Sequence, residues 1–308
     1  MRRSFSALVS SRSRRGVRDI ILVADDFAMS GGVTAGIESL ARHGRISATS
    51  AIVTLPRWRQ DGPRLAALRD RIAIGLHINL TLGRPLGAMP LLAPDGTFVG
   101  LDPLLRAALR GKRDREEIAA EIGRQLDEFE RITGFPPDIV DGHQHVHALP
   151  LVRDGLIAAL QRRFAGKSVR PLVRVPSDNI VAILKRRRAV AKAVSLTLLS
   201  LGFRSKLERA GYPYNDSFAG VSSFSDRLDT VAAEIRVARR AASEFHLVMC
   251  HPGVPSDELA RIDPVVDRRS VELALLGRDN AITPRLWLPA RDATGSVIDW
   301  RREQDRSP

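Results

Sequence analysis

The 308-residue sequence has one cysteine, few aromatic residues and no long apolar run. A single cysteine, Cys250, excludes an intramolecular disulfide, so the fold must rest on its hydrophobic core, and we expect a protein of the reducing cytoplasm. No run approaches the roughly 20 apolar residues that a membrane-spanning helix needs. Aromatic residues make up 5% of the chain and do not alternate with basic ones, as they do in many nucleic-acid-binding surfaces.

The short motifs of several enzyme classes are absent as well. The sequence contains no His-Glu-x-x-His, no Cys-x-x-Cys and no Gly-x-Ser-x-Gly, and the stretch from Gly31 to Gly36 lacks the lysine of a phosphate-binding loop. Zincin-type proteases, serine hydrolases with a nucleophile elbow and P-loop enzymes are therefore not indicated.

Positive charge, by contrast, is abundant, with a formal net charge of +13 at pH 7. It attracts polyanions and anionic membranes at long range but does not by itself indicate specific binding. An arginine-rich composition can also reflect the base composition of a genome, so we do not expect nucleic acid as a partner. The basic and apolar residues of 180–203 leave two interpretations open, a packed helix with a solvated basic end or peripheral contact with a membrane.

The two ends of the chain differ in composition from the part between them. Residues 1–18 carry six arginines and no acidic residue, and serines and arginines interrupt the apolar stretch that a twin-arginine export signal would need. We expect a disordered basic extension or an organellar leader at 1–18, one catalytic domain at 19–298 and a polar tail at 299–308.

Short apolar runs alternate with helical periodicities along this domain. The alternation predicts an α/β fold with a parallel sheet, either doubly wound or closed into a barrel. We expect buried strands within residues 19–24, 47–54, 72–77, 138–140, 172–175 and 246–250, and helices near 33–42, 115–132, 151–164, 180–201, 227–241 and 264–276. The Pro- and Gly-rich segment 83–100 is long for a plain connection and indicates an active-site loop or lid.

Histidine and aspartate gather where the predicted strands end. In parallel sheets and barrels the functional edge is the carboxyl end of the strands, and this is where the sequence places Asp25, Asp26, His77, His143, His145, His147 and His251. Alone, the aspartate pair could cap a helix and His77 could be a core histidine. His-x-His-x-His is more specific, because at strand spacing the three imidazoles share one face. One carboxylate and two imidazoles suit a divalent metal that activates water.

Cys250 and His251 are neighbours but do not indicate a nucleophilic pair. Adjacent residues of an extended strand point to opposite sides, so the thiol and the imidazole cannot form a dyad. We expect Cys250 to be a core thiol, and His251 to leave the strand at the edge of the sheet, where it can act on a substrate.

Four motifs occur in an order that resembles one family. They are residues 24–27 with Ser30, residues 75–79, residues 141–147 and residues 249–253. With these motifs the sequence resembles, over residues 19–276, the YdjC-like carbohydrate deacetylases, which include chitooligosaccharide deacetylases and deacetylases of hopanoid biosynthesis. The resemblance implies a single-domain, irregular (β/α) TIM-like barrel of the polysaccharide-deacetylase type, one divalent metal ion, zinc or magnesium, and a homodimer.

The resemblance also implies roles for individual residues. Asp26, His77 and His143 match the metal ligands, Asp25 the general base and His251 the general acid. A weaker match over residues 215–220 places Asp216 and Phe218 near the sugar. Further residues expected to bind substrate or to support the ligands are Asn79, His145 and His147.

We therefore predict a metal-dependent hydrolase that removes the acetyl group of an N-acetylated sugar, such as an N-acetylglucosamine oligosaccharide or glycolipid. Two alternatives stay open. A hydrolase or phosphoesterase on the same scaffold would keep the metal ligands but release no acetate. A non-catalytic protein that binds polyanions or membranes would not depend on Asp25.

Overall fold

The computed structural model describes residues 20–109, 115–240, 243, 245–278, 286–289 and 298–300. The predicted extension at 1–18 and all but two residues of the predicted tail at 299–308 lie outside them. Among the described residues, no helix is both long and apolar enough to cross a membrane.

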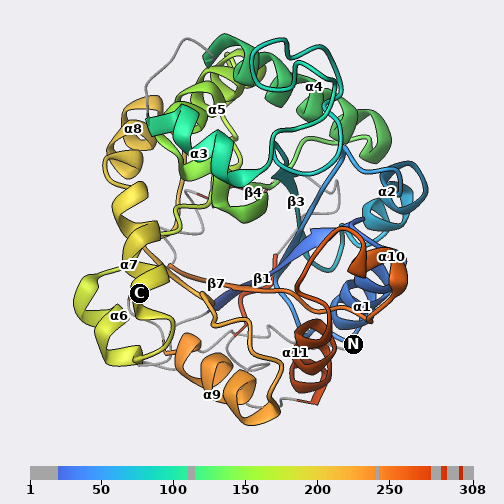
Figure 1. Ribbon diagram of the computed structural model, residues 1–308, viewed down its shortest axis with the longest axis vertical. Coiled ribbons are helices and arrows are strands. Elements are labelled where there is room, and N and C mark those ends of the chain that lie inside the picture. The colour runs from blue at the N-terminus through green and yellow to red at the C-terminus, as the bar shows by residue number, and fades with distance from the viewer. Residues whose placement is uncertain are drawn as a thin grey trace, which may run out of the picture.

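Seven parallel strands form one curved sheet with helices packed around its outside (Figure 1). The strands run in the spatial order β5-β4-β3-β2-β1-β7-β6, and every neighbouring pair is parallel. This confirms the predicted α/β fold with an irregular barrel in a single domain. The strands are β1 (Ile20–Phe27), β2 (Ala48–Ala51), β3 (Ala73–Ile78), β4 (Ile139–Gly142), β5 (Leu172–Val173), β6 (Ser217–Ala219) and β7 (His246–Cys250).

Helices follow most of the strands and return the chain to the amino end of the next one. They are α1 (Gly31–Arg42), α2 (Trp58–Ala66), α3 (Leu101–Leu109), α4 (Arg115–Thr133), the 3-10 helix η1 (His143–Ala148), α5 (Pro150–Arg163), α6 (Ile180–Arg186), α7 (Val190–Leu199), α8 (Phe203–Ala210), α9 (Leu228–Ala238), α10 (Asp257–Ala260) and α11 (Asp267–Arg278). The single helix predicted at 180–201 is wrong. Arg187 and Ala189 adopt left-handed backbone angles, with φ of 53° and 44°, and divide it into α6 and α7.

The period-two pattern of the strands separates two apolar clusters. In β1, Ile20, Leu22 and Ala24 belong to the large cluster between the sheet and the helices. Ile21 and Val23 point the other way, into a smaller cluster that fills the barrel. Both faces of each strand are therefore buried, as the continuous apolar runs predict.

The gap between the edge strands β5 and β6 is bridged by a side chain. Asn215 is fully buried; its Oδ1 accepts a hydrogen bond from the Val175 N–H (2.7 Å), and its Nδ2 donates to the carbonyls of Val175 and Ser217 (both 3.0 Å). The Val173 N–H donates to the Pro213 carbonyl (2.9 Å). The amide of Asn215 thus takes the place of a strand peptide and closes the barrel.

Replacing Asn215 with alanine should destabilise the protein by about 2–4 kcal/mol, because it leaves buried backbone groups of Val175 without partners. Urea unfolding followed by circular dichroism measures the loss. The control is Asn179→Ala, which removes an exposed N-cap from α6 and should cost about 1 kcal/mol. Equal losses in the two variants would contradict the closing role of Asn215.

Aromatic side chains cover the amino end of the barrel. The indole Nε1 of Trp300 donates to the Asp138 carbonyl (2.7 Å), and its ring lies 4.7 Å from the ring of Trp287 and 5.8 Å from that of Phe245. Trp300 is buried, although it belongs to the segment predicted as a polar tail. Since this end is filled, the polar groups of the interior meet at the opposite, carboxyl end.

Candidate active site

The side chains at the carboxyl end of the barrel continue the inward-facing rows of the strands. Asp25 lies two residues after Val23 and His77 lies four residues after Ala73, so both point into the barrel above the apolar cluster. The same alternation brings to this place Ser50, Asp141, Arg174 and His251. The polar residues therefore gather at the carboxyl edge of the sheet, as predicted, because every second residue of each strand points into the barrel.

Asp26 should point away from the barrel, since it neighbours Asp25, but the backbone turns it inward. Its φ is 70°, and the register between β1 and β2 shifts between Ala24 and Phe27. Such a bulge re-aims a side chain at some cost in backbone strain, as is common next to active sites. Both aspartates therefore face the interior.

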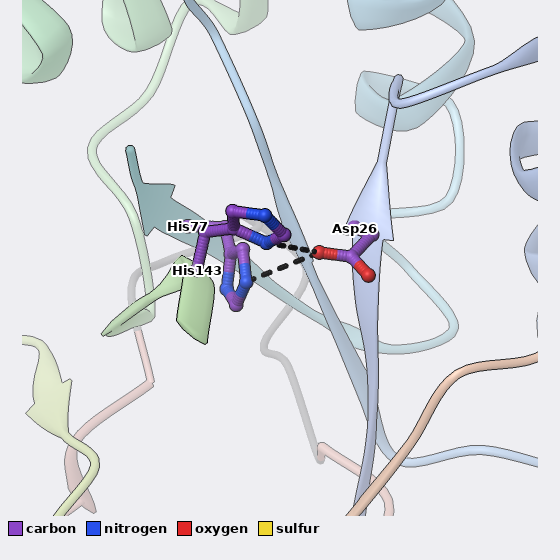
Figure 2. A group of neighbouring side chains, drawn as sticks. All are labelled: Asp26, His77 and His143. Carbon is purple, nitrogen blue, oxygen red and sulfur yellow. Dashed lines mark hydrogen bonds and ion pairs between the residues drawn. The ribbon is translucent and has the colours of Figure 1, made fainter. Parts of the chain in front are cut away.

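Asp26, His77 and His143 converge on one point (Figure 2). The Oδ1 atom of Asp26 lies 3.3 Å from His77 Nε2 and 3.1 Å from His143 Nδ1. One ligand atom from each residue lies within 4.8 Å of the other two, and all three side chains are buried or nearly so. The predicted ligand set is thus brought together by β1, β3 and the start of η1, which follows β4.

Ion pairs fix the atoms of Asp26 and His77 that face away from the point of convergence. Asp26 Oδ2 is 2.7 Å from Arg269, and His77 Nδ1 is 2.7 Å from Asp141 Oδ1. Burial raises the pKa of Asp26, but Arg269, His143 and His77 outweigh burial and hold it well below its usual range. Burial lowers the pKa of His77, but Asp141 and Asp26 outweigh it and raise this pKa to about 10. The site therefore favours positive charge between these side chains.

Arg174 joins the second aspartate of the pair to this group. The fully buried guanidinium donates to both oxygens of Asp25 (2.7 and 2.6 Å) and lies 2.5 Å from Asp141 Oδ2. Its pKa is raised because Asp141 and Asp25 outweigh its burial. Asp25 is thereby held in one orientation, and His251 Nε2 lies 4.0 Å from its Oδ2.

The charges of this network leave room for a dication. Asp25, Asp26, Asp141 and Asp263 share the two guanidinium groups of Arg174 and Arg269. Without a metal, a proton on His77 offsets one of the two remaining negative charges. When both imidazoles are neutral, as metal binding requires, two negative charges are uncompensated in a buried site, which is costly unless a cation binds. A divalent ion held by one carboxylate and two imidazoles fits both this balance and the donor set.

A second group of potential ligands, Asp25, His77 and Asp141, lies in the same network. It suits a metal less well, because Arg174 already occupies both carboxylates and its positive charge would repel the ion. The Nδ1 atom of His77 is engaged by Asp141, which leaves Nε2 free to face Asp26. We therefore assign any metal to Asp26, His77 and His143.

Comparison with known proteins identifies the family of the chain. The profile of the family described as YdjC-like protein matches residues 19–282. The chain belongs to the YdjC-like family. Among its relatives, it is 30% identical to the mouse carbohydrate deacetylase over 253 residues, which cover 77% of this chain and 78% of the relative. It is 38% identical to the chitooligosaccharide deacetylase of Serratia marcescens over 133 residues, which cover 43% and 52%.

A crystal structure from Enterococcus faecalis V583 shares the fold of this YdjC-like protein. The Enterococcus protein is provisionally described as a cellobiose-phosphate cleavage protein. Its sequence is 21% identical to this chain, and the two structures align with a TM-score of 0.62 over 89% of this chain and 97% of the Enterococcus chain. At this identity the likeness supports the barrel fold alone.

The His-x-His-x-His segment of the YdjC-like chain differs from the predicted strand. After Gly142 it turns into η1, and Gln144 and His145 adopt left-handed angles, with φ of 52° and 59°. The three imidazoles consequently diverge. His143 faces Asp26, whereas His147 Nε2 lies 3.0 Å from the carbonyl of Arg174, and burial lowers the pKa of His147 to about 3.

His145 contacts Phe218, which is buried in the apolar cluster inside the barrel. The two rings meet edge to face with centroids 5.7 Å apart, and the guanidinium of Arg174 lies 5.9 Å from the centre of the Phe218 ring. His145 is partly exposed, and burial lowers its pKa well below the usual range. Because Phe218 is buried and His145 is partly exposed, His145 is the more accessible of the two, and contact with a sugar stays a prediction for both.

The side chains of Asn79 and Asp216 are not part of the network around Asp26, His77 and His143. The side chain of Asn79 is fully engaged with Thr54 and with the backbone of Thr81 and Leu82, so it shapes the loop after β3. Asp216 precedes β6 at the amino end, where its carboxylate accepts a hydrogen bond from the Phe245 N–H (3.2 Å). The structure does not bring Asp216 to the other predicted site residues.

The surroundings of Cys250 and His251 agree with the separation expected from the strand. Cys250 is buried on the outer face, and burial raises its pKa well above the usual range. The His251 N–H donates to Glu272 Oε2 (2.6 Å), and Arg268 holds the other oxygen of Glu272 (2.7 Å). Residues of α11 therefore fix the backbone from which His251 enters the site.

Replacing Asp141 with asparagine should weaken metal binding by about 10–100-fold, because the carboxylate that orients His77 and carries negative charge next to it is lost. Titration of the metal-depleted protein with zinc measures the change. Asp154→Asn removes a carboxylate from the surface ion pair with Lys206 and should leave the affinity as it is. Unchanged affinity in Asp141→Asn would show that His77 does not need this partner.

Proposed function

We propose that this YdjC-like protein is a metal-dependent hydrolase that removes the acetyl group of an N-acetylated sugar. The observation that carries the proposal is the buried meeting of Asp26, His77 and His143 beside a carboxylate, Asp25, that lies outside this ligand set. The names of the mouse and Serratia relatives, a carbohydrate deacetylase and a chitooligosaccharide deacetylase, support the substrate class. A cytoplasmic location and a homodimer stay predictions.

The metal would be held by Asp26, His77 and His143, and zinc and magnesium both suit one carboxylate and two imidazoles with open positions. When bound, such an ion polarises an amide carbonyl and lowers the pKa of a bound water toward about 7–9. Arg269 keeps Asp26 ionised and fixes its second oxygen, so that Oδ1 alone is directed toward the two imidazoles.

Asp25 acts as the general base. Two charge-assisted hydrogen bonds from Arg174 fix the plane of its carboxylate, so its remaining lone pairs have a defined direction. In this orientation the carboxylate takes a proton from the water that attacks the acetamide carbon. General-base catalysis of this kind contributes on the order of 10²–10⁴-fold.

His251 acts as the general acid. Its Nε2 lies 4.0 Å from Asp25 Oδ2, and the imidazole is partly exposed at the carboxyl end of β7. Its position beside Asp25 supports the role of proton donor to the departing amine of the sugar. Protonation of the nitrogen lets the carbon–nitrogen bond break, giving acetate and a free amino sugar.

The test is acetate release from a panel of N-acetylglucosamine oligosaccharides and glycolipids by purified, metal-depleted protein with zinc or magnesium restored. We expect acetate only with metal. p-Nitrophenyl phosphate is included as a competing substrate class. Phosphate release without acetate would overturn the proposal in favour of a phosphoesterase, and acetate release that ignores metal would overturn the metal dependence.

A further inference from the structure

The insertion between β5 and β6 contains an apolar helix that is only partly covered. Seven of the ten residues of α7 (Val190–Leu199) are Ala, Val or Leu, yet none of them is buried. α6 (Ile180–Arg186) buries only Ile183. A helix of this composition normally packs an apolar face against a core. The outward residues of this α6–α7 surface are Ile180, Val181, Leu184, Leu198 and Leu201, which are 43–63% exposed.

Further exposed apolar residues lie in the connections between the strands. Of the twelve large hydrophobic residues that are exposed in the described chain, all except Leu288 lie in segments that follow the carboxyl end of a strand. Besides the α6–α7 surface, these are Leu86, Leu91 and Val99 after β3, Phe224 and Leu228 after β6, and Val254 after β7. Where exposed apolar residues lie together, they mark an interaction surface.

Unpaired positive charge lies within the same surface. Residues 179–207 contain seven basic residues and no acidic one. Four of the seven are engaged: Arg186 with Asp178, Lys206 with Asp154, Arg204 with the Ser177 carbonyl, and Lys192 over the ring of Phe224. The other three, Lys185, Arg187 and Arg188, are exposed and form no ion pair within the described part of the chain.

We propose that the α6–α7 surface, together with Lys185, Arg187 and Arg188, docks onto an anionic lipid bilayer. Basic residues beside exposed leucine and valine on short helices match an interface where phosphate headgroups lie above acyl chains. Nucleic acid would use the cations but not the aliphatic side chains. The bilayer uses both.

The docking surface lies next to the catalytic group. Arg186 donates from the base of α6 to the carbonyl of Phe218 (3.3 Å), and the ring of Phe218 contacts His145. In Figure 1, α6 and α7 lie at the periphery of the barrel beside the strands. The α6–α7 surface is therefore connected to the catalytic group through Phe218.

The experiment is vesicle flotation of the full chain with phosphatidylcholine alone or mixed with phosphatidylglycerol. We expect partition onto the mixed vesicles that falls as salt rises. Lys185→Glu with Arg188→Glu should lower the partition at least about tenfold, since each cation near an anionic surface contributes roughly fivefold. Leu184→Gln with Leu198→Gln keeps the charge and should lower it roughly tenfold through the lost apolar insertion.

The matched control is Arg71→Glu with Lys167→Glu, which changes the net charge equally. Both residues are exposed and precede β3 and β5, at the amino end. The partition of this double variant onto the mixed vesicles should differ from that of the unchanged protein by less than about twofold. Because flotation requires no turnover, its outcome is independent of the proposed function, and circular dichroism verifies that each variant is folded.

Three outcomes would overturn the proposal. Partition that is unchanged in both α6–α7 variants would place membrane contact elsewhere. Binding to double-stranded DNA that the charge variant loses and the leucine variant keeps, without vesicle binding, would assign the surface to polyanions. A dimer in light scattering that the leucine variant alone loses, again without vesicle binding, would assign it to a second copy of the chain.

Discussion

Asp25→Asn should lower kcat by about 10²–10⁴-fold while the protein retains its metal. Asp25 is not in the group of Asp26, His77 and His143, and both of its oxygens face Arg174. An asparagine side chain still accepts a hydrogen bond from Arg174 through its carbonyl, but it cannot take a proton from water at neutral pH. Acetate release and metal content, measured on the same preparation, separate these two effects.

A control for the loss of a buried Asp–Arg pair is Asp61→Asn. Asp61 is fully buried, pairs with Arg57 and Arg64, and lies in α2, with no contact to Asp25 among the described interactions. Its replacement should reduce stability and leave kcat within a few-fold. Asp25→Asn enzyme with nearly full turnover would remove Asp25 from the role of base, and loss of metal in that variant would make it a ligand instead.

The strands and the histidines at their ends could be predicted because both are local patterns. A run such as residues 20–24 is apolar on both faces, and that pattern identifies a strand buried on both sides. His77 and His251 end such strands, so strand geometry alone directs them to the open end of the barrel. Asp26 reaches the same place only because of a bulge and a positive φ. No residue type in this segment predicts either feature.

Arg174 is the residue that sequence reasoning missed. It follows a strand of two residues, and its partner Asp25 lies 149 positions away in the sequence. No periodicity links residues at that distance. The one available indication was a cation at the end of an apolar run, a place where burial is expected and an unpaired charge is not tolerated. Asp141 was visible in its motif, but only the structure shows it holding both His77 and Arg174.

The geometry of residues 143–147 could not be predicted for a related reason. Strand spacing puts three imidazoles on one face, and this assumed that β4 continues. β4 instead ends at Gly142, where an added Cβ would lie 2.9 Å from His147 Nδ1. The turn that follows directs His143 to Asp26 and His147 to the backbone of Arg174. One motif thereby supplies a potential ligand and a support for the residue that holds the base.

His143→Ala should abolish both metal binding and turnover. With His143 gone, Asp26 and His77 offer two ligand atoms where three converge, and we expect affinity for zinc to fall by more than about 100-fold, beyond the effect of removing a supporting partner. Without metal the acetamide carbonyl is not polarised, so kcat should fall to background. Zinc titration of the metal-depleted protein and acetate release at saturating zinc measure the two losses.

His145→Ala is the matched control, because it removes an imidazole from the same turn. His145 contacts Phe218 and makes no contact with Asp26 among the described interactions. The His145→Ala variant should retain zinc. If its activity falls, we expect KM to rise and kcat to stay the same, since a contact with sugar contributes to binding. If His143→Ala kept its zinc while His145→Ala lost it, the ligand would be His145, two residues further along η1. Asp26 Oδ1 would then face His143 as a hydrogen-bond acceptor only.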